Sequence, residues 1–166
     1  MLFKPDIKLR GITDITVELL NKFNINALLL DIDNTMSTHH GDVLTDGLLE
    51  WIDKMQQNKI KLLVLSNSKI ERVEPFSKRI GLPFISSACK PLPHGYLRGI
   101  KALNEKRKNV AIVGDQMFTD ILGGRLVGVK KILLTPIKPE DGWTFRLRRN
   151  LEKKLYKIYK LQDYEG

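Results

Sequence analysis

The sequence predicts an α/β fold: a doubly wound parallel sheet covered by helices on both faces, in three layers. Short apolar runs rich in β-branched residues alternate with segments of helical periodicity, which is typical of such sheets. The runs are apolar almost throughout, as expected of strands buried on both faces. A chain of 166 residues with 42% hydrophobic content is large enough for one compact core.

Five apolar runs are the expected strands, at positions 27–32, 60–65, 84–87, 110–113 and 129–134. A short amphipathic helix is expected before them, at about 13–23, with Thr13 or Asp14 as its N-cap. The next helix is expected to begin near Thr45 or Asp46 and to place four apolar side chains on one face: Leu48, Leu49, Ile52 and Met55. Further helices are expected at 70–80, 95–103 and 119–127.

The C-terminal segment 143–161 differs from the rest of the chain. Four apolar residues lie four, four and three positions apart, at Leu147, Leu151, Leu155 and Ile158. Basic residues surround them: Arg146, Arg148, Arg149, Lys153, Lys154, Lys157 and Lys160. This pattern predicts a strongly basic amphipathic helix. We therefore divide the chain into an α/β domain at 1–140 and a basic amphipathic C-terminal extension at 141–166.

Composition restricts the class of protein. The formal net charge of +9 attracts anions such as phosphate esters, nucleic acid or an acidic lipid surface. Cys89 is the only cysteine, which excludes an intramolecular disulfide and a cysteine-based metal cage and indicates an intracellular protein. No signal peptide is visible, and no apolar run approaches the roughly 20 residues of a membrane-spanning helix. We expect a cytoplasmic protein.

Polar residues follow four of the apolar runs, where the predicted strands end. In open α/β sheets, ligands bind beyond the carboxyl ends of the strands. The residues found there are Asp31-Ile32-Asp33-Asn34-Thr35, Ser66-Asn67, Lys90-Pro91, and Gly114-Asp115 followed by Asp120. Taken singly, each is an ordinary cap or turn residue. Their joint placement, in this order, predicts a single functional site.

This ordered set resembles the four motifs of the haloacid dehalogenase superfamily, over roughly residues 25–135. Within the superfamily, Asp-Ile-Asp-Asn-Thr and Gly-Asp-Gln-Met-Phe-Thr-Asp resemble the small subfamily IIIA phosphatases of the YqeG-like group. That group is similar in turn to the mitochondrial-type phosphatidylglycerophosphate phosphatases. Met36 stands where the group usually has leucine, a conservative change. The resemblance implies a Rossmannoid fold of the haloacid dehalogenase type and hydrolysis of a phosphate monoester.

The resemblance also implies a role for each aspartate. Asp31 is the expected nucleophile and forms an aspartyl-phosphate, which divides one difficult hydrolysis into two easier steps. Asp33 is expected to protonate the leaving alcohol and then to activate the attacking water. Mg²⁺ is the implied cofactor, because a hard dication takes oxygen ligands. Its expected ligands are the carboxylates of Asp31 and Asp115 and the backbone carbonyl of Asp33.

Other polar residues are expected to bind the phosphate or to hold the catalytic residues in place. The phosphate is expected to bind Ser66, Asn67 and Lys90. Asp120 is expected to orient a metal-bound water or Lys90, with direct metal ligation as the alternative. The turn after the nucleophile is expected to be braced by Asn34 and Thr35. His39 and His40 are expected to be solvated flap residues. His94 is expected in the first turn of a helix, with contact to the substrate as the alternative.

Many members of the superfamily carry a cap domain over the site, but here there is no room for one. Segment 36–45 is long enough for a flap only, and segment 67–89 holds one helix and one strand. An uncapped, C0-type site is open to solvent, which favours a large substrate or one presented on a surface. A phosphorylated lipid head group fits that opening.

The first expectation is therefore a Mg²⁺-dependent phosphatase that converts phosphatidylglycerophosphate to phosphatidylglycerol as a peripheral protein on the inner face of the membrane. The basic helix would bind anionic lipid, with its leucines, Trp143, Phe145 and Tyr159 in the interface; alternatively it packs on the domain or in a homo-oligomer. A second alternative is a phosphatase for soluble sugar phosphates or nucleic-acid ends. A third is a basic RNA- or ribosome-binding module with a vestigial site, although no RNA-binding signature is apparent.

Overall fold

The computed structural model describes residues 2–38, 43–138 and 143–164, and for residues 143–149 it describes the backbone alone. Six strands, all parallel to their neighbours, form one sheet in the order β1-β6-β5-β2-β3-β4. The strands are β1 (Ile7–Leu9), β2 (Ala27–Leu30), β3 (Lys61–Leu65), β4 (Phe84–Ile85), β5 (Val110–Gly114) and β6 (Lys130–Leu134). The predicted fold class is confirmed.

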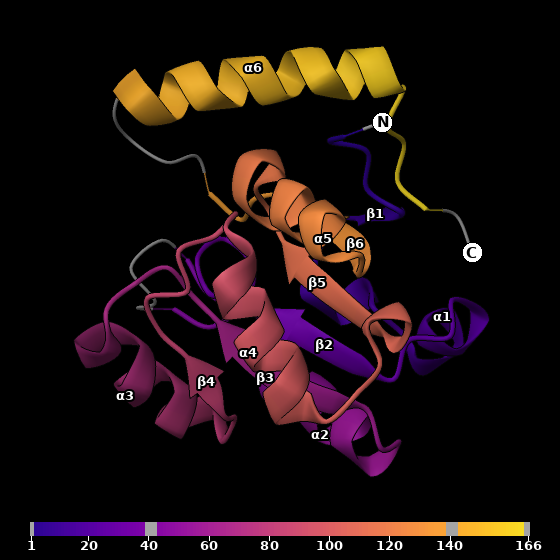
Figure 1. The fold of residues 1–166 in the computed structure, drawn as a ribbon, viewed down its shortest axis with the longest axis vertical. Coiled ribbons are helices and arrows are strands. Elements are labelled where there is room, and N and C mark those ends of the chain that lie inside the picture. Colours follow the sequence, from indigo (N-terminus) through magenta and orange to yellow (C-terminus); the bar gives the residue numbers. More distant parts are fainter. Residues whose placement is uncertain (1, 39–42, 139–142, 165–166) are drawn as a thin grey trace.

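Helices cover both faces of this sheet (Figure 1). One face is covered by α1 (Val17–Lys22), α2 (Leu48–Gln57) and α3 (Ile70–Ile80), and the other by α4 (Pro93–Leu103) and α5 (Leu122–Val127). Short helical segments are η1 (Ile12–Asp14), η2 (Arg107–Asn109) and η3 (Met117–Ile121), the last a π-helix. The chain ends with α6 (Trp143–Tyr159).

The central strand β2 shows why the expected runs are apolar almost throughout. Leu28 and Leu30 point into the core shared with α1, α2 and α3, whereas Ala27 and Leu29 point into the core under α4 and α5. All four side chains are fully buried, and burying one leucine contributes about 1.5–3 kcal/mol. Because β2 pairs with β3 on one side and β5 on the other, the residues that follow it lie at the middle of the sheet edge.

The edge strand β1 was not expected from the sequence. It pairs in parallel with β6, with Ile7 opposite Ile132 and Leu9 opposite Leu134. Its three residues are too few to show a clear apolar run, and its middle residue is a lysine. Its partner strand lies more than 120 positions away. Only tertiary contacts therefore reveal that this segment belongs to the sheet.

The single helix expected at about 13–23 is wrong: the segment forms η1 and then α1. Neither Thr13 nor Asp14 caps α1. Instead Thr16 has an extended backbone, and its side-chain hydroxyl accepts a hydrogen bond from the backbone N–H of Leu19 at 3.1 Å. The carboxylate of Asp14 accepts from the backbone N–H of Gly11 at 3.0 Å. Two local polar side chains therefore divide a segment that its apolar spacing would make continuous.

The next helix also begins later than expected, at Leu48 rather than near Thr45 or Asp46, after a glycine with a φ of +73°. Leu49, expected on the buried face, is exposed. Trp51 is buried in its place, and its indole N–H donates to a backbone carbonyl in the linker between η1 and α1 at 2.8 Å. The large aromatic ring and its hydrogen bond therefore set the rotation of α2 about its axis.

The C-terminal helix α6 lies along the side of the domain where η3 and β6 are found (Figure 1). Leu155, Tyr156 and Tyr159 pack against the core residues Met117, Ile121 and Leu133. The described part of the helix also exposes apolar and basic side chains: Leu151, Lys153, Lys154, Lys157 and Ile158. Of the predicted apolar side chains that the structure describes, Leu155 therefore packs on the domain, whereas Leu151 and Ile158 face solvent. Trp143, Phe145, Leu147 and the three arginines of the expected stripe lie at positions whose side chains are outside the description.

The described residues contain no inserted cap domain. After Asp33, Ser37 pairs with Leu44 in an antiparallel bridge, and the backbone N–H of Thr38 donates to the carbonyl of Val43 at 3.0 Å. The expected flap residues His39 and His40 lie outside the described residues. None of the helices in the described ranges combines the length and apolar character needed to cross a bilayer.

Candidate active site

The predicted polar residues meet where the parallel strands end. Asp31 follows β2, Ser66 follows β3, and Asp115 follows β5. Lys90 follows β4 after a short loop and reaches the same place from the neighbouring edge of the sheet. The four segments lie together because parallel strands open all their carboxyl ends on one side.

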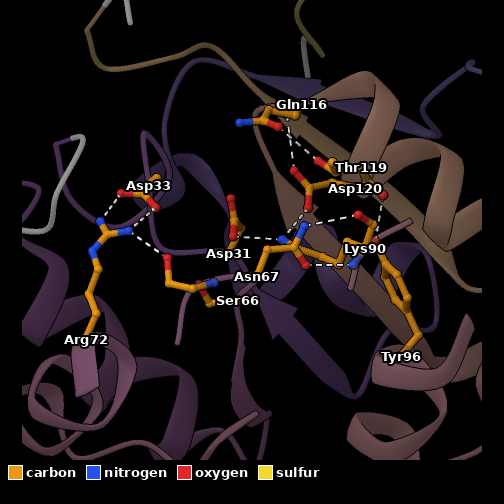
Figure 2. A network of polar contacts seen from close by, with 11 residues as sticks. Asp31, Asp33, Ser66, Asn67, Arg72, Lys90, Tyr96, Gln116, Thr119 and Asp120 are labelled. Carbon is orange, nitrogen blue, oxygen red and sulfur yellow. Dashed lines mark hydrogen bonds and ion pairs between the residues drawn. The ribbon is translucent and has the colours of Figure 1, made fainter. Parts of the chain in front are cut away.

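Lys90 is the centre of the charge arrangement. Its ammonium nitrogen lies 2.7 Å from a carboxylate oxygen of Asp31 and 2.7 Å from one of Asp120 (Figure 2). The Lys90 side chain is only 2% exposed. Burial would lower the pKa of the Lys90 ammonium, but the carboxylates of Asp120 and Asp31 act in the opposite direction and raise it overall. Lys90 is therefore a fixed positive charge inside the site.

Burial raises the pKa of the Asp31 carboxyl from its ordinary value to about 7. Lys90 opposes this shift, whereas the nearby charges of Asp120 and Asp33 add to it. Several carboxylates with one close ammonium group between them leave an excess of negative charge, which disfavours ionisation. A cation or an added proton would relieve this excess.

Asp31, Asp115 and Asp120 form a cluster of three buried carboxylates. One oxygen of each lies within 4.8 Å of the others, and this is the group among the described residues that could hold a metal ion. Carboxylate oxygens at these separations fit a hard divalent cation such as Mg²⁺. Gly114 makes the cluster possible, because a Cβ at that position would lie 2.2 Å from the Asp120 carboxyl carbon.

A set of hydrogen bonds from η3 and α4 holds Asp120. The second oxygen of Asp120 accepts from the backbone N–H of Gln116 at 3.2 Å, and the Gln116 side chain accepts from the Thr119 hydroxyl at 3.1 Å. The buried hydroxyl of Tyr96 in α4 donates to the Thr119 carbonyl at 2.8 Å (Figure 2). Gly123 gives the ring its space, because a Cβ there would lie 2.3 Å from the Tyr96 hydroxyl oxygen.

Asn67 joins the loop after β3 to the loop after β4. Its amide oxygen accepts from the backbone N–H of Lys90 at 2.6 Å, and its amide nitrogen donates to the Lys90 carbonyl at 3.0 Å. The neighbouring Ser66 is buried, and its hydroxyl oxygen accepts from the backbone N–H of Ser68 at 3.1 Å. The structure therefore brings Ser66, Asn67 and Lys90 together, and their binding of phosphate stays a prediction.

Arg72 is a site residue that the sequence analysis did not find. Its guanidinium group donates to both carboxylate oxygens of Asp33, one of them at 2.9 Å, and to the hydroxyl of Ser68 at 2.7 Å (Figure 2). A bidentate arginine fixes the plane of a carboxylate as well as its place. The available signal was its position in the first turn of the helix after Ser66, but that position alone is common on solvated helix surfaces.

Comparisons with known proteins agree with this geometry. The family model described as haloacid dehalogenase-like hydrolase matches residues 8–128. The chain belongs to the haloacid dehalogenase-like hydrolases. It is 34% identical over 162 residues to the probable phosphatase YqeG of Bacillus subtilis, covering 98% of this chain and 94% of that protein. The predicted superfamily and enzyme class are thereby confirmed.

Two further similarities are more distant. The chain is 29% identical over 140 residues to the mitochondrial phosphatidylglycerophosphatase GEP4 of Saccharomyces cerevisiae, covering 76% of this chain and 75% of that protein. A solved structure of a haloacid dehalogenase superfamily subfamily IIIA hydrolase from Legionella pneumophila matches with a TM-score of 0.51 and 15% identity. That match covers 86% of this chain and 88% of the other, and it supports the fold alone.

Three further residues of this haloacid dehalogenase-like hydrolase were assigned from the sequence: Asn34, Thr35 and His94. Asn34 is buried with a φ of 55°, and its amide oxygen accepts from the backbone N–H of Lys138 at 3.1 Å. Thr35 is buried beside it, and its backbone N–H donates to Ile32 at 3.2 Å. His94 lies exposed in the first turn of α4, as expected. The bracing role of Asn34 and Thr35 stays a prediction.

Proposed function

We propose that this chain is a Mg²⁺-dependent phosphatase that hydrolyses a phosphate monoester through an aspartyl-phosphate on Asp31. One observation carries the proposal: Asp31 lies at the carboxyl edge of the sheet, ion-paired to buried Lys90, in a cluster of three carboxylates. A phosphate dianion repels nucleophiles, so its hydrolysis needs positive charge and in-line positioning. The cluster and Lys90 supply a cation site and a fixed ammonium group at one point.

The carboxylates of Asp31 and Asp115 would hold Mg²⁺, together with the backbone carbonyl of Asp33. Bound there, Mg²⁺ neutralises charge on the carboxylates and on the phosphate oxygens. Asp120 shares the cluster, but its two oxygens also accept from Lys90 and from the Gln116 backbone. These two bonds support a role in placing Lys90 rather than in binding the metal ion directly.

The chain's own residues account for both steps of the reaction. A carboxylate oxygen of Asp31 forms a bond to phosphorus while the bond from phosphorus to the ester oxygen breaks, and Asp33 gives its proton to that leaving oxygen. Water then attacks phosphorus, its proton returns to Asp33, and the bond between phosphorus and Asp31 breaks. Lys90 and Ser66 bind the phosphate oxygens. Arg72 positions Asp33, which it binds through both oxygens.

For the substrate we propose phosphatidylglycerophosphate, hydrolysed to phosphatidylglycerol at the inner face of the membrane by a peripheral cytoplasmic protein. The site is uncapped in the described residues, which suits a head group presented on a surface. One relative, at 29% identity, is named a phosphatidylglycerophosphatase. The exposed face of α6 adds lysines beside Leu151 and Ile158, a combination that favours an anionic lipid surface.

The test is phosphate release from phosphatidylglycerophosphate in mixed vesicles, compared with soluble sugar phosphates and 5′-phosphorylated oligonucleotides. The wild type is expected to prefer the lipid and to require Mg²⁺, and Asp31→Asn to release no phosphate from any of them. Efficient cleavage of a soluble ester with the lipid untouched would reject the proposed substrate but keep the reaction. Activity that survives in Asp31→Asn would reject the mechanism.

The role of α6 on the membrane has its own test. Leu151→Ser with Ile158→Ser is expected to weaken sedimentation of the protein with phosphatidylglycerol vesicles, because both side chains are exposed. The matched control is Leu126→Ser, which alters an exposed leucine on α5 instead. Equal vesicle binding by all three proteins would show that this face of α6 does not contact the lipid.

A further inference from the structure

We propose that the C-terminal helix α6 belongs to the catalytic apparatus, and that its Glu152 is a positioning residue for the loop that carries Asp115 and Asp120. The proposal rests on the roles assigned above to those two aspartates, and it does not depend on which ester is the substrate. The family model ends at residue 128, before α6 begins. The similarity to YqeG extends over 98% of the chain and includes the helix.

Glu152 makes a direct contact with the catalytic loop. One of its carboxylate oxygens accepts a hydrogen bond from the backbone N–H of Met117 at 2.9 Å. The residue is only 1% exposed, although it is acidic and lies in a strongly basic segment. A buried carboxylate is costly unless hydrogen bonds compensate for its lost hydration. The position of Glu152 therefore indicates a specific contact rather than general packing.

The contact falls at the start of η3, the π-helix that carries Asp120. The first N–H groups of a helix have no acceptor within the helix itself. Here the N–H of Gln116 is bound by Asp120, and the N–H of Met117 is bound by Glu152. The second of these hydrogen bonds, at 2.9 Å, joins the start of η3 directly to α6. The loop between Asp115 and Asp120 is thus attached to α6 on one side and to Lys90 on the other.

The neighbours of Glu152 on α6 make apolar contacts instead of a hydrogen bond to the loop. Leu155 and Tyr156 lie one turn later and pack with their apolar parts against Met117 and Ile121. These apolar contacts hold the helix against the domain, as for any amphipathic helix. Glu152 alone among these three side chains offers a charged acceptor to the catalytic loop. Helix docking and loop positioning can therefore be separated by mutation.

A second contact ties the segment before α6 to the other catalytic loop. The backbone N–H of Lys138 donates to the side-chain oxygen of Asn34 at 3.1 Å. Asn34 directly follows Asp33 in the turn after the nucleophile. Residues beyond the family model thus contact both the loop after β2 and the loop after β5. This arrangement supports a catalytic edge that is completed only when the C-terminal segment is docked.

The experiment compares full-length Glu152→Ala, Glu152→Gln and Leu155→Ala with the wild type. Mg²⁺ affinity is measured by calorimetry without substrate, alongside kcat and KM for p-nitrophenyl phosphate and the midpoint of thermal unfolding. Glu152→Ala is expected to lose about 10- to 100-fold in Mg²⁺ affinity, the range for residues that orient metal ligands. Glu152→Gln keeps an oxygen acceptor and is expected to recover most of that loss. Leu155→Ala should lower the unfolding midpoint while leaving Mg²⁺ affinity near wild type.

Two outcomes would decide against the proposal. Unchanged Mg²⁺ affinity in Glu152→Ala would overturn it, and so would an equal loss in Leu155→Ala, because docking alone would then account for the effect. If Glu152→Ala does not fold, Glu152→Asp takes its place: its carboxylate is one methylene too short, so unchanged affinity would again overturn the proposal. A wild type that binds Mg²⁺ but cleaves no ester would reject the proposed function alone, since the calorimetry still tests Glu152.

Discussion

The structure predicts a large loss of stability for Lys90→Met. Methionine keeps an unbranched side chain of similar length but removes the ammonium group. That group lies 2.7 Å from carboxylates of both Asp31 and Asp120 and is almost fully buried. Its loss leaves a cluster of buried carboxylates with no ammonium group in contact, in a site that already disfavours the ionisation of Asp31.

The magnitude follows from the cost of a buried charge that has lost its partner, about 3–5 kcal/mol. In a domain of this size that corresponds to a fall in the unfolding midpoint of about 6–20 °C. The assay pH decides whether both members of the Lys90–Asp31 pair are charged. The pKa of Lys90 is raised above its ordinary 10.5, so its stabilising effect is complete at pH 8. Asp31, with a pKa of about 7, is mainly ionised at that pH, so the ion pair carries both charges.

The assay is calorimetric unfolding at pH 8, with and without Mg²⁺. Mg²⁺ is expected to restore part of the loss in Lys90→Met, because a cation in the cluster replaces the missing positive charge. The matched control is Lys78→Met, which removes a lysine from an exposed ion pair with Glu74 at 2.9 Å. Surface pairs of this kind contribute about 0–1 kcal/mol. Equal midpoints for the two variants would refute the charge argument, as would a Lys90→Met deficit that Mg²⁺ leaves unchanged.

Three further predictions concern the carboxylate cluster and the residues that hold it. Gly114→Ala is expected to weaken Mg²⁺ binding by about tenfold or more in calorimetry, because its Cβ would displace Asp120; Gly11→Ala, with open space at its Cβ, should bind normally. Mg²⁺ affinity is expected to fall about tenfold from pH 8 to pH 6, because protons compete for Asp31, whose pKa is about 7; a flat calorimetric profile would contradict this. Tyr96→Phe should lower the free energy of unfolding by about 1 kcal/mol in urea titrations, since it removes the hydrogen bond from Tyr96 to the part-buried carbonyl of Thr119; wild-type stability would show that water replaces the bond.

Five of the six strands and the catalytic motifs were predictable because their signals are local. The helix expected at 70–80 has the same bounds as α3. Its apolar spacing identifies the buried face, and Gly81 after it marks the C-terminal end. The apolar run at 110–113 identifies β5 to within one residue. Asp31, Lys90 and Asp120 were found because each follows a strand at a recognisable interval, and strand direction then brings them to one edge.

Other features depended on contacts between distant segments. Arg72 acquires its function only because the turn after β2 places Asp33 within its reach, 39 positions away in sequence. The strand β1 exists only because β6 offers it a partner. The spacing of Leu151, Leu155 and Ile158 predicted an apolar stripe, yet only Leu155 packs on the core. No periodicity distinguishes an apolar side chain at the edge of an interface from one at its centre.

Sequence alone determined the alternation of strands β2 to β6 with helices, the polar residues at the strand ends and the basic character of the C-terminal segment. These depend on side-chain chemistry and on periods of two and 3.6 residues, which any chain with this pattern would share. Tertiary structure alone decided that Glu152 contacts Met117, that Arg72 binds Asp33, and which face of α6 meets the domain. Such contacts depend on distances between elements, and packing across the whole core sets those distances.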